Sequence, residues 1–198
     1  MTIFWDVDTQ VDFMLPGGKL YVPGAERIIG PLGQLTRWAG AHQIPVIASA
    51  CRHIPGDSEL EIYGQHCMAG TAGQQKIPET LLARRVAIPN RTIELPDFGP
   101  FEQIVIEKQA FDVFTNPNTE EVVKKFGSNP RIILYGVATD ICVAAAARAL
   151  VARACRVELV TDAVAALDER EAAKFVEWFQ KNTGELTTVS GVVGRGTA

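Results

Sequence analysis

Short apolar runs alternate along the chain with longer segments in which apolar residues recur at helical spacing. The runs predict strands over residues 3–8, 44–48, 104–107, 131–136, 156–160 and 186–189. The spaced patterns predict helices near 28–38 and 144–150 and over 119–126 and 169–181. Strands separated by helices need crossover connections, which favour parallel pairing in right-handed βαβ units. The pattern therefore predicts an α/β fold with a mainly parallel sheet covered by helices on both faces.

The segment from residue 54 to 100 lacks this alternation. It is rich in proline and glycine, and residues 90–95 suggest a short strand among loops. A long irregular excursion from an α/β core is more often a functional cover than a linker. The 198 residues are the size of one large domain. We therefore expect a single domain over residues 1–198.

Composition and charge narrow the range of partners. The net charge is −4 and there is no basic run, so neither nucleic acid nor an anionic membrane surface is expected as a partner. The apolar stretches are far short of a membrane span. The chain starts without the basic segment of a secretory signal, so we expect a cytoplasmic protein whose four cysteines stay reduced.

The most informative stretch is residues 131–143, where a buried strand is predicted to turn directly into a helix. Thr139 or Asp140 can cap that helix, which places Cys142 in its first turn. Free backbone N–H groups and the helix dipole would lower the pKa of the thiol there and could also hold an oxyanion. Alternatively, Cys142 is a small buried apolar residue, as free cysteines usually are. The stretch alone leaves both interpretations open.

If the predicted strands form a parallel sheet, several reactive side chains lie at the same edge of it. Different predicted strands are followed by Asp8, by residues 51–53, by Lys108 and by Cys142. The carboxyl ends of parallel strands meet at one edge, where α/β folds carry their sites. An ammonium beside a thiol favours the thiolate, and a nearby carboxylate can take the thiol proton and return it to a leaving amine. The pattern therefore brings an acid, a lysine and a cysteine to one edge. Taken singly, a strand-end aspartate is often a turn residue and a strand-end lysine is usually solvated.

Four motifs carry a family resemblance. They are residues 6–13 (DVDTQVDF), 66–73 (HCMAGTAG), 106–108 (IEK) and 136–143 (GVATDICV). In this order they resemble the isochorismatase-like cysteine hydrolases, which include nicotinamidases, carbamoylsarcosine amidases and maleamate amidases. The resemblance implies a three-layer αβα fold with a Rossmann-like central sheet. It also implies an amidohydrolase that cleaves the C–N bond of a small amide, with a nicotinamidase-like activity as one candidate.

The resemblance also implies roles for single residues. It assigns a catalytic triad to Asp8, Lys108 and Cys142: the carboxylate is general base and then acid, the ammonium is the electrostatic anchor, and the thiol forms the acyl-enzyme. It implies a cis peptide bond between Val137 and Ala138, with the backbone N–H groups of Ala138 and Cys142 as oxyanion donors. Spacing alone cannot show a cis bond, which is rare outside X-Pro.

Nicotinamidase-type relatives also bind a metal, and the resemblance extends to that site. Cys51, His53 and His66 stand where such relatives have an aspartate and two histidines, and these side chains are good zinc ligands. Asp57 or Glu59 could supply a further ligand. No cofactor is certain from the sequence, and zinc or another divalent ion is the candidate.

Residues that flank the motifs can form the rest of the pocket. Phe13 and Phe111 can provide an aromatic wall for a flat substrate, and Arg52 can bind a substrate carboxylate. The resemblance further implies a homo-oligomer, and residues 54–100 are a candidate for a subunit contact or for a neighbouring pocket wall. Two other functions stay open. One is a vinyl-ether hydrolase of the isochorismatase type, whose chemistry needs no thiol, and the other is a catalytically idle interaction module on the same fold.

Overall fold

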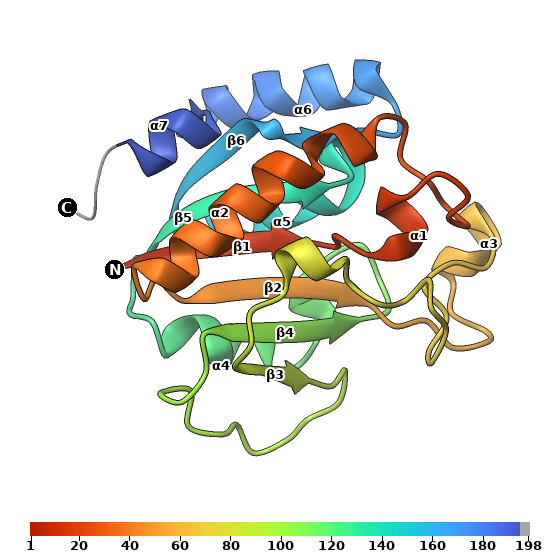
Figure 1. Ribbon diagram of the computed structural model, residues 1–198, viewed down its shortest axis with the longest axis horizontal. Helices are drawn as coiled ribbons and strands as arrows, with labels where there is room; N and C mark the ends of the chain where they lie inside the picture. The colour runs from red at the N-terminus through yellow and green to blue at the C-terminus, as the bar shows by residue number, and fades with distance from the viewer. Residues whose placement is uncertain (195–198) are drawn as a thin grey trace.

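The computed structural model describes residues 1–194, and within them seven strands form one parallel sheet (Figure 1). The strands are β1 (Thr2–Val7), β2 (Val46–Cys51), β3 (Arg85–Ile88), β4 (Gln103–Lys108), β5 (Arg131–Val137), β6 (Arg156–Ala165) and β7 (Glu185–Thr187). Their order in the sheet is β3-β4-β2-β1-β5-β6-β7. β1 is the central strand, with β2 on one side and β5 on the other, and the carboxyl end of a strand at which the order reverses is where such sheets carry their sites.

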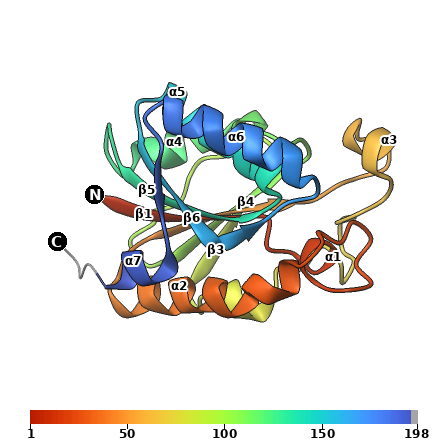
Figure 2. The same cartoon turned by 90° about the horizontal axis from the view of Figure 1, so that it is seen from above.

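Helices cover both faces of this sheet (Figure 2). One face carries α2 (Ile29–Ala41) and α7 (Val189–Val193), and the other carries α4 (Thr119–Lys124), α5 (Ala144–Ala152) and α6 (Glu169–Lys181). Two short helices, α1 (Val11–Met14) and α3 (Glu59–Tyr63), lie beyond the carboxyl ends of the strands. Single turns of 3-10 or π helix occur at Ala25–Ile28, Pro78–Thr80, Val113–Thr115 and Thr139–Val143. The predicted three-layer αβα fold is confirmed. Among residues 1–194, no helix has the length and apolar character needed to cross a membrane.

Alternate residues of β1 pack against the two helical layers. Ile3, Trp5 and Val7 pack with side chains of α4, α5 and α6, whereas Phe4 packs with those of α2 and α7. All four are at most 1% exposed, and burial of each such side chain stabilises the fold by about 1.5–3 kcal/mol. Burial on both faces explains why the strand pattern in the sequence is a continuous apolar run and not an alternation.

The short strand of the irregular segment lies earlier than expected. It is β3, at residues 85–88, and residues 90–95 are a loop. The Asn118 side chain fixes that loop, because its amide donates to the carbonyl of Arg91 at 2.8 Å and its oxygen accepts from the N–H of Ile93 at 3.2 Å. These bonds replace the partner strand that the β-prone composition of the segment could otherwise have paired with.

The end of the described chain also differs from the prediction. The last strand, expected over 186–189, ends at Thr187, and α7 begins at Val189. The Thr188 hydroxyl accepts from the N–H of Gly191 at 3.1 Å, which caps the new helix. The valines of this segment favour a strand by propensity, but the Thr188 cap and packing against α2 stabilise a helix here.

Strand register brings the predicted site residues to the same edge. Cys51 and Lys108 are directly opposite each other on β2 and β4, and Val7 is opposite Gly136 on β5. Gly136 has a φ of +117°, and a Cβ atom there would lie 2.1 Å from the carbonyl oxygen of Val7. Only glycine allows β1 and β5 to approach so closely at this level, and Asp8 follows directly beyond it.

Candidate active site

A buried chain of three functional groups lies at the carboxyl edge of the sheet. Lys108 Nζ is 2.9 Å from Asp8 Oδ2 and donates to Cys142 Sγ at 3.5 Å. Asp8 and Lys108 are fully buried and Cys142 is 6% exposed. Lys108 also donates to the carbonyl of Ala110 at 3.0 Å. The fold thus brings together three residues from three separate strand ends, with the ammonium between the carboxylate and the thiol.

The two charged members of this chain hold each other in their ionised forms. Burial alone would raise the pKa of Asp8, but the charge of Lys108 and hydrogen bonds from Ser49 and Lys108 bring it below its usual value. Burial alone would lower the pKa of Lys108, but the Asp8 carboxylate raises it well above the usual range. Ser49 Oγ donates to Asp8 Oδ1 at 2.6 Å. The sequence analysis missed Ser49, and its signal is a polar residue inside the apolar run of β2.

Cys142 lies on one turn of π helix, Thr139–Val143, that leads from β5 into α5. The peptide bond between Val137 and Ala138 is cis. The Ala138 carbonyl accepts hydrogen bonds from the N–H groups of Ile141, at 3.1 Å, and Val143, at 3.0 Å. These backbone bonds hold the turn that carries the thiol.

The predicted side-chain cap of this helix is wrong. Neither Thr139 nor Asp140 caps it, because the residue at the cap position is Ala138 and no side chain bonds there. The Asp140 carboxylate instead accepts from the N–H groups of Leu167, at 3.0 Å, and Asp168, at 2.9 Å. Asp140 therefore ties the Cys142 turn to the segment that precedes α6.

A second thiol shares the same lysine. Lys108 Nζ donates to Cys51 Sγ at 3.1 Å, closer than its contact with Cys142. The hydrogen bond between the thiols lowers the pKa of Cys51 to about 6. The same bond, together with burial, raises the pKa of Cys142 well above its usual value. The helix start and the lysine therefore do not bring the pKa of Cys142 below its usual value, contrary to the expectation from the sequence, and Asp8 is the neighbouring carboxylate that can accept its proton.

A narrow, mainly apolar cavity opens onto Cys142. Its wall is formed by Phe13, Leu20, Val22, Glu59, Tyr63, Phe111, Val137, Ala138, Ile141, Cys142 and Leu167. Phe13 and Phe111 thus lie where an aromatic wall was expected. The Tyr63 ring packs edge-on against Phe111, with ring centroids 5.9 Å apart. Among the described residues of this wall, Glu59 carries the only charge.

Arg52 does not contribute to this cavity. Its side chain is 46% exposed, and its Nε lies 3.3 Å from Glu107 Oε1. Consecutive residues of an extended segment point to opposite sides, so the inward direction of Cys51 sends Arg52 outwards. This position contradicts the expectation that Arg52 binds a substrate carboxylate in the cavity.

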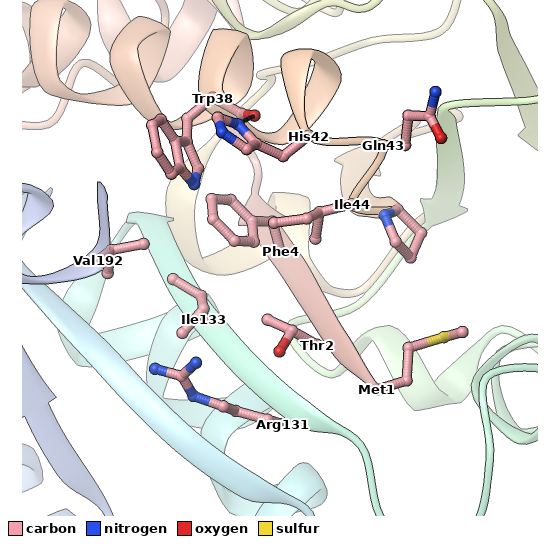
Figure 3. A pocket seen from close by; sticks show the side chains of 11 residues that line it. Met1, Thr2, Phe4, Trp38, His42, Gln43, Ile44, Arg131, Ile133 and Val192 are labelled. Atoms are coloured by element: carbon pink, nitrogen blue, oxygen red, sulfur yellow. Dashed lines mark hydrogen bonds between the residues drawn. The ribbon is translucent and has the colours of Figure 1, made fainter. Parts of the chain in front are cut away.

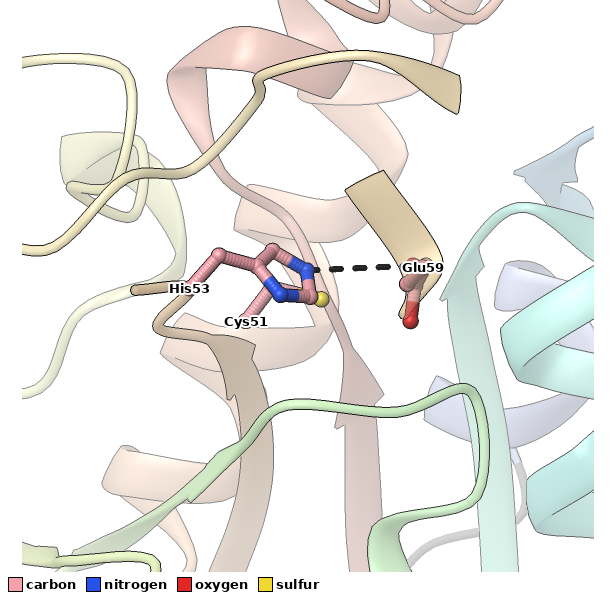
Figure 4. Close-up of side chains that lie close together, drawn as sticks. All are labelled: Cys51, His53 and Glu59. Carbon is pink, nitrogen blue, oxygen red and sulfur yellow. Dashed lines mark ion pairs between the residues drawn. The ribbon is translucent and has the colours of Figure 1, made fainter. Parts of the chain in front are cut away.

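Beside the cavity, three side chains of metal-binding type converge (Figure 4). The ligand atoms of Cys51, His53 and Glu59 all lie within 4.8 Å of one another. His66 adds to the group, because its Nε2 lies 3.5 Å from Glu59 Oε1, while His53 Nε2 lies 3.8 Å from the same oxygen. We call these four residues the ligand cluster. The structure keeps the three predicted ligands close together and, of the two candidates for a further ligand, brings Glu59 to them.

The ligand cluster fits a divalent cation. Within the described part of the chain, both Nε2 atoms and Glu59 Oε2 are buried without a hydrogen-bond partner, which is costly unless something else satisfies them. On the other side of each ring, His53 Nδ1 contacts Asp57 Oδ2 at 3.0 Å and His66 Nδ1 contacts the Gly64 carbonyl at 2.9 Å. These acceptors place the ring hydrogens on Nδ1 and leave the Nε2 lone pairs facing Glu59. Asp57 therefore orients a ligand and is not one itself.

Residues 3–190 match the model of the isochorismatase domain. The chain belongs to the isochorismatase family. The family prediction from the four sequence motifs is thereby confirmed, and the chain is a hydrolase of this family. Among curated proteins, none matches the chain.

Three solved structures illustrate what this isochorismatase-family chain is similar to. An isochorismatase-like hydrolase from Alkaliphilus metalliredigens is 21% identical, with a TM-score of 0.80 over 99% of each chain. An N-carbamoylsarcosine amidase from Thermoplasma acidophilum is 26% identical, with a TM-score of 0.76 over 96% of this chain and 97% of that one. A pyrazinamidase of Pyrococcus horikoshii in complex with zinc is 22% identical, with a TM-score of 0.76 over 94% of this chain and 98% of that one.

The isochorismatase-family sheet also has a wider hollow at the opposite end of its strands (Figure 3). This hollow, of about 260 Å³, lies between the start of β1 and the end of α2. Trp38 and His42 stack in its wall with ring centroids 3.6 Å apart, and Arg131 is already paired with Glu158 at 3.0 Å. The residues that line it include no cysteine and no acid, so the reactive groups are those at the Cys142 end.

Proposed function

We propose that this protein hydrolyses the C–N bond of a small amide through an acyl-enzyme on Cys142. The observation that carries the proposal is the position of Lys108 Nζ, 2.9 Å from Asp8 Oδ2 and 3.5 Å from the Sγ of Cys142, which is part of the wall of the apolar cavity. A nucleophile, a base and a fixed cation within contact distance are what acyl transfer by a thiol requires.

In the first half of the reaction, Asp8 takes the thiol proton while Cys142 Sγ attacks the amide carbonyl carbon. The N–H groups of Ala138 and Cys142 are the proposed donors to the oxyanion that forms. The C–N bond then breaks, and Asp8 returns the proton to the departing amine. In the second half, Asp8 takes a proton from a water molecule while the water oxygen attacks the thioester carbon. The C–S bond then breaks, the acid leaves, and Asp8 returns the proton to Cys142 Sγ. Lys108 stays charged throughout and balances the negative charge.

The cavity favours an uncharged, flat acyl group. Phe13, Tyr63 and Phe111 offer aromatic surface, on which a planar ring can pack. The described wall itself offers no side-chain cation to a substrate carboxylate, so the aromatic surface is what the protein provides for the acyl group. This supports amides such as nicotinamide or pyrazinamide over maleamate or carbamoyl amino acids.

The ligand cluster has a supporting part in this proposal. Cys51, His53, Glu59 and His66 would hold a divalent ion, which would supply a fixed positive charge beside the cavity in addition to the acyl chemistry of the thiol. Asp8 and Lys108 perform the proton transfer and the charge balance without it.

The direct test is ammonia release from nicotinamide, pyrazinamide, maleamate and carbamoyl amino acids. Replacement of Cys142 by Ala should lower kcat/KM for the best substrate by at least about 10³-fold, because the nucleophile is lost. The matched control is Cys155→Ala, since Cys155 is also buried but lies outside the cavity wall, and it should keep full turnover. Wild-type rates in Cys142→Ala would refute the mechanism.

The two rival functions give different results in the same experiment. A vinyl-ether hydrolase of the isochorismatase type would turn over isochorismate in both the wild type and Cys142→Ala. A catalytically idle interaction module would release no ammonia from any amide, and iodoacetamide would label its cysteines at similar, slow rates.

We also infer that the protein is a cytoplasmic homo-oligomer. The reduced state of all four cysteines, which are free in the structure, agrees with that compartment. The irregular segment 54–100, with Ile54 and Ile62 exposed, is the part of the surface that supports a subunit contact.

A further inference from the structure

Cys51 is the residue that links the ligand cluster to the catalytic lysine. It is fully buried at the end of β2. Its Sγ accepts from Lys108 Nζ at 3.1 Å on one side and lies within 4.8 Å of the ligand atoms of His53 and Glu59 on the other. No other side chain among the described residues contacts both groups in this way, so its chemistry decides what the cluster can hold.

The main chain of Cys51 is held from both sides. Gln10 Oε1 accepts from the Cys51 N–H at 2.7 Å, and Gln10 Nε2 donates to the Cys51 carbonyl at 2.8 Å. A third bond joins Gln10 Nε2 to the Gln74 carbonyl at 2.6 Å. The sulfur is therefore fixed in position before any ion arrives, which is a requirement of a tight metal site.

We infer that Cys51 binds a metal ion as a thiolate and, with His53, Glu59 and His66, forms a site selective for zinc-type ions over hard ions such as Mn²⁺ and Mg²⁺. A thiolate is a soft ligand that favours zinc and cobalt, whereas carboxylate and carbonyl oxygens suit magnesium and manganese. Two imidazoles, one thiolate and one carboxylate are a four-ligand set of the kind that tetrahedral zinc prefers.

The charges of the ligand cluster also favour a divalent ion. A thiolate and the Glu59 carboxylate together carry two negative charges, which a divalent cation neutralises. The Lys108 ammonium is already balanced by Asp8 at 2.9 Å, so it leaves the two charges of the cluster for the ion. The inference goes beyond the proposed function, because it concerns which ion is bound and through which atom, and its test needs no substrate.

The experiment uses the full-length protein, stripped of metal and titrated with Co²⁺ and with Zn²⁺. Wild-type protein should bind one Co²⁺ per chain and develop a thiolate-to-cobalt charge-transfer band in the near ultraviolet. Zn²⁺ should displace Co²⁺ and remove the band. Bound Zn²⁺ should also slow the labelling of Cys51 by iodoacetamide, as seen by peptide mapping.

Two variants at Cys51 distinguish the loss of a metal ligand from the loss of the folded structure. Cys51→Ser should lose the band and weaken zinc binding by at least about 10-fold, because a hydroxyl is a poor substitute for a ligating thiolate. Cys51→Asp keeps an anionic ligand, so it should still bind Co²⁺ but without the band, and its preference for Zn²⁺ over Mn²⁺ should fall by at least about 10-fold. Retained binding without the band rules out unfolding as the cause.

The matched control is Cys142→Ser, because Cys142 contacts the same lysine and hydrogen-bonds to Cys51 but lies outside the ligand cluster, and a serine hydroxyl keeps that hydrogen bond. It should keep both the band and the zinc affinity. A band that survives in Cys51→Ser, or wild-type protein that binds no divalent ion, would overturn the inference. Since Cys142→Ser cannot complete the proposed hydrolysis, metal binding in that variant is judged independently of activity.

Discussion

At the residue scale, the identity of the side chains around a buried lysine decides whether it takes part in chemistry. The sheet contains two buried lysine–aspartate pairs: Lys108 with Asp8 at 2.9 Å, and Lys76 with Asp6 at 3.1 Å. Lys76 donates its next bond to the Ser49 carbonyl, whereas Lys108 reaches two thiols. A buried ion pair alone is weak evidence for function or stability, and the thiols mark Lys108 as the reactive one.

Replacement of Lys108 by Met tests this difference. Without the ammonium the pKa of Cys142 should rise further, since Lys108 is the group that lowers it. The rate of Cys142 alkylation by iodoacetamide should therefore reach its plateau at a higher pH, as followed by peptide mapping. Lys76→Met is the control: both variants leave a buried carboxylate unpaired and should lose about 3–5 kcal/mol of stability, but Lys76→Met should keep the wild-type pH profile. An unchanged profile in Lys108→Met would show that Lys108 does not act on Cys142.

At the element scale, the thiol is positioned by a tie between two helices. The turn Thr139–Val143 has no side-chain cap. The two oxygens of Asp140 accept instead from the backbone just before α6. The position of Cys142 in the cavity wall therefore depends on a contact to a segment that is remote in sequence.

The variant Asp140→Asn should weaken this tie, because the amide keeps one oxygen that accepts a backbone N–H while its nitrogen cannot accept the other. The expected loss is about 1–2 kcal/mol of stability, together with a fall in kcat larger than any change in KM, since the nucleophile is displaced. The control is Asp168→Ala. Asp168 caps α6 by accepting from the N–H groups of Arg170 and Glu171, so the loss of its carboxylate should cost similar stability and leave kcat unchanged. Denaturant unfolding and steady-state kinetics measure both, and equal effects on kcat would contradict a positioning role for Asp140.

At the scale of the whole molecule, the irregular segment 54–100 has two faces. Its inner side brings Glu59 and Tyr63 into the cavity wall. Its outer side exposes Ile54 and Ile62, which are 47% and 66% exposed, on the part of the molecule where α3 extends away from the sheet (Figure 2). Exposed apolar residues next to a site are typical of contacts between subunits.

Light scattering coupled to size exclusion should therefore find an oligomer at micromolar concentration. Ile62→Glu should shift the mass towards the monomer, because a charge buried in an apolar contact is unpaired. Leu186→Glu is the matched control, since Leu186 is 38% exposed but lies on β7, away from this segment. If the wild-type protein is monomeric at this concentration, the proposed subunit contact is wrong.

The sequence by itself determined the layered fold, the family and the three strand ends that carry Asp8, Lys108 and Cys142. Apolar periodicity is a local signal, and the right-handed crossover is a general rule of parallel sheets. Periodicity and crossover handedness together predict that the strand ends lie at one edge of the sheet, even when no contact between residues is known. Short elements such as β3 and α7 were not predicted correctly, because four or five residues carry too little pattern to outweigh the influence of their surroundings.

Only the tertiary structure decided which way the remaining side chains point. Cys51 shares Lys108 with Cys142 because β2 and β4 are in a particular register, and Arg52 turns outwards for the same reason. Glu59 meets His53 and His66 because a long loop folds back over the sheet edge. Register and loop path are set by contacts between residues distant in the chain, so no local pattern could have revealed them.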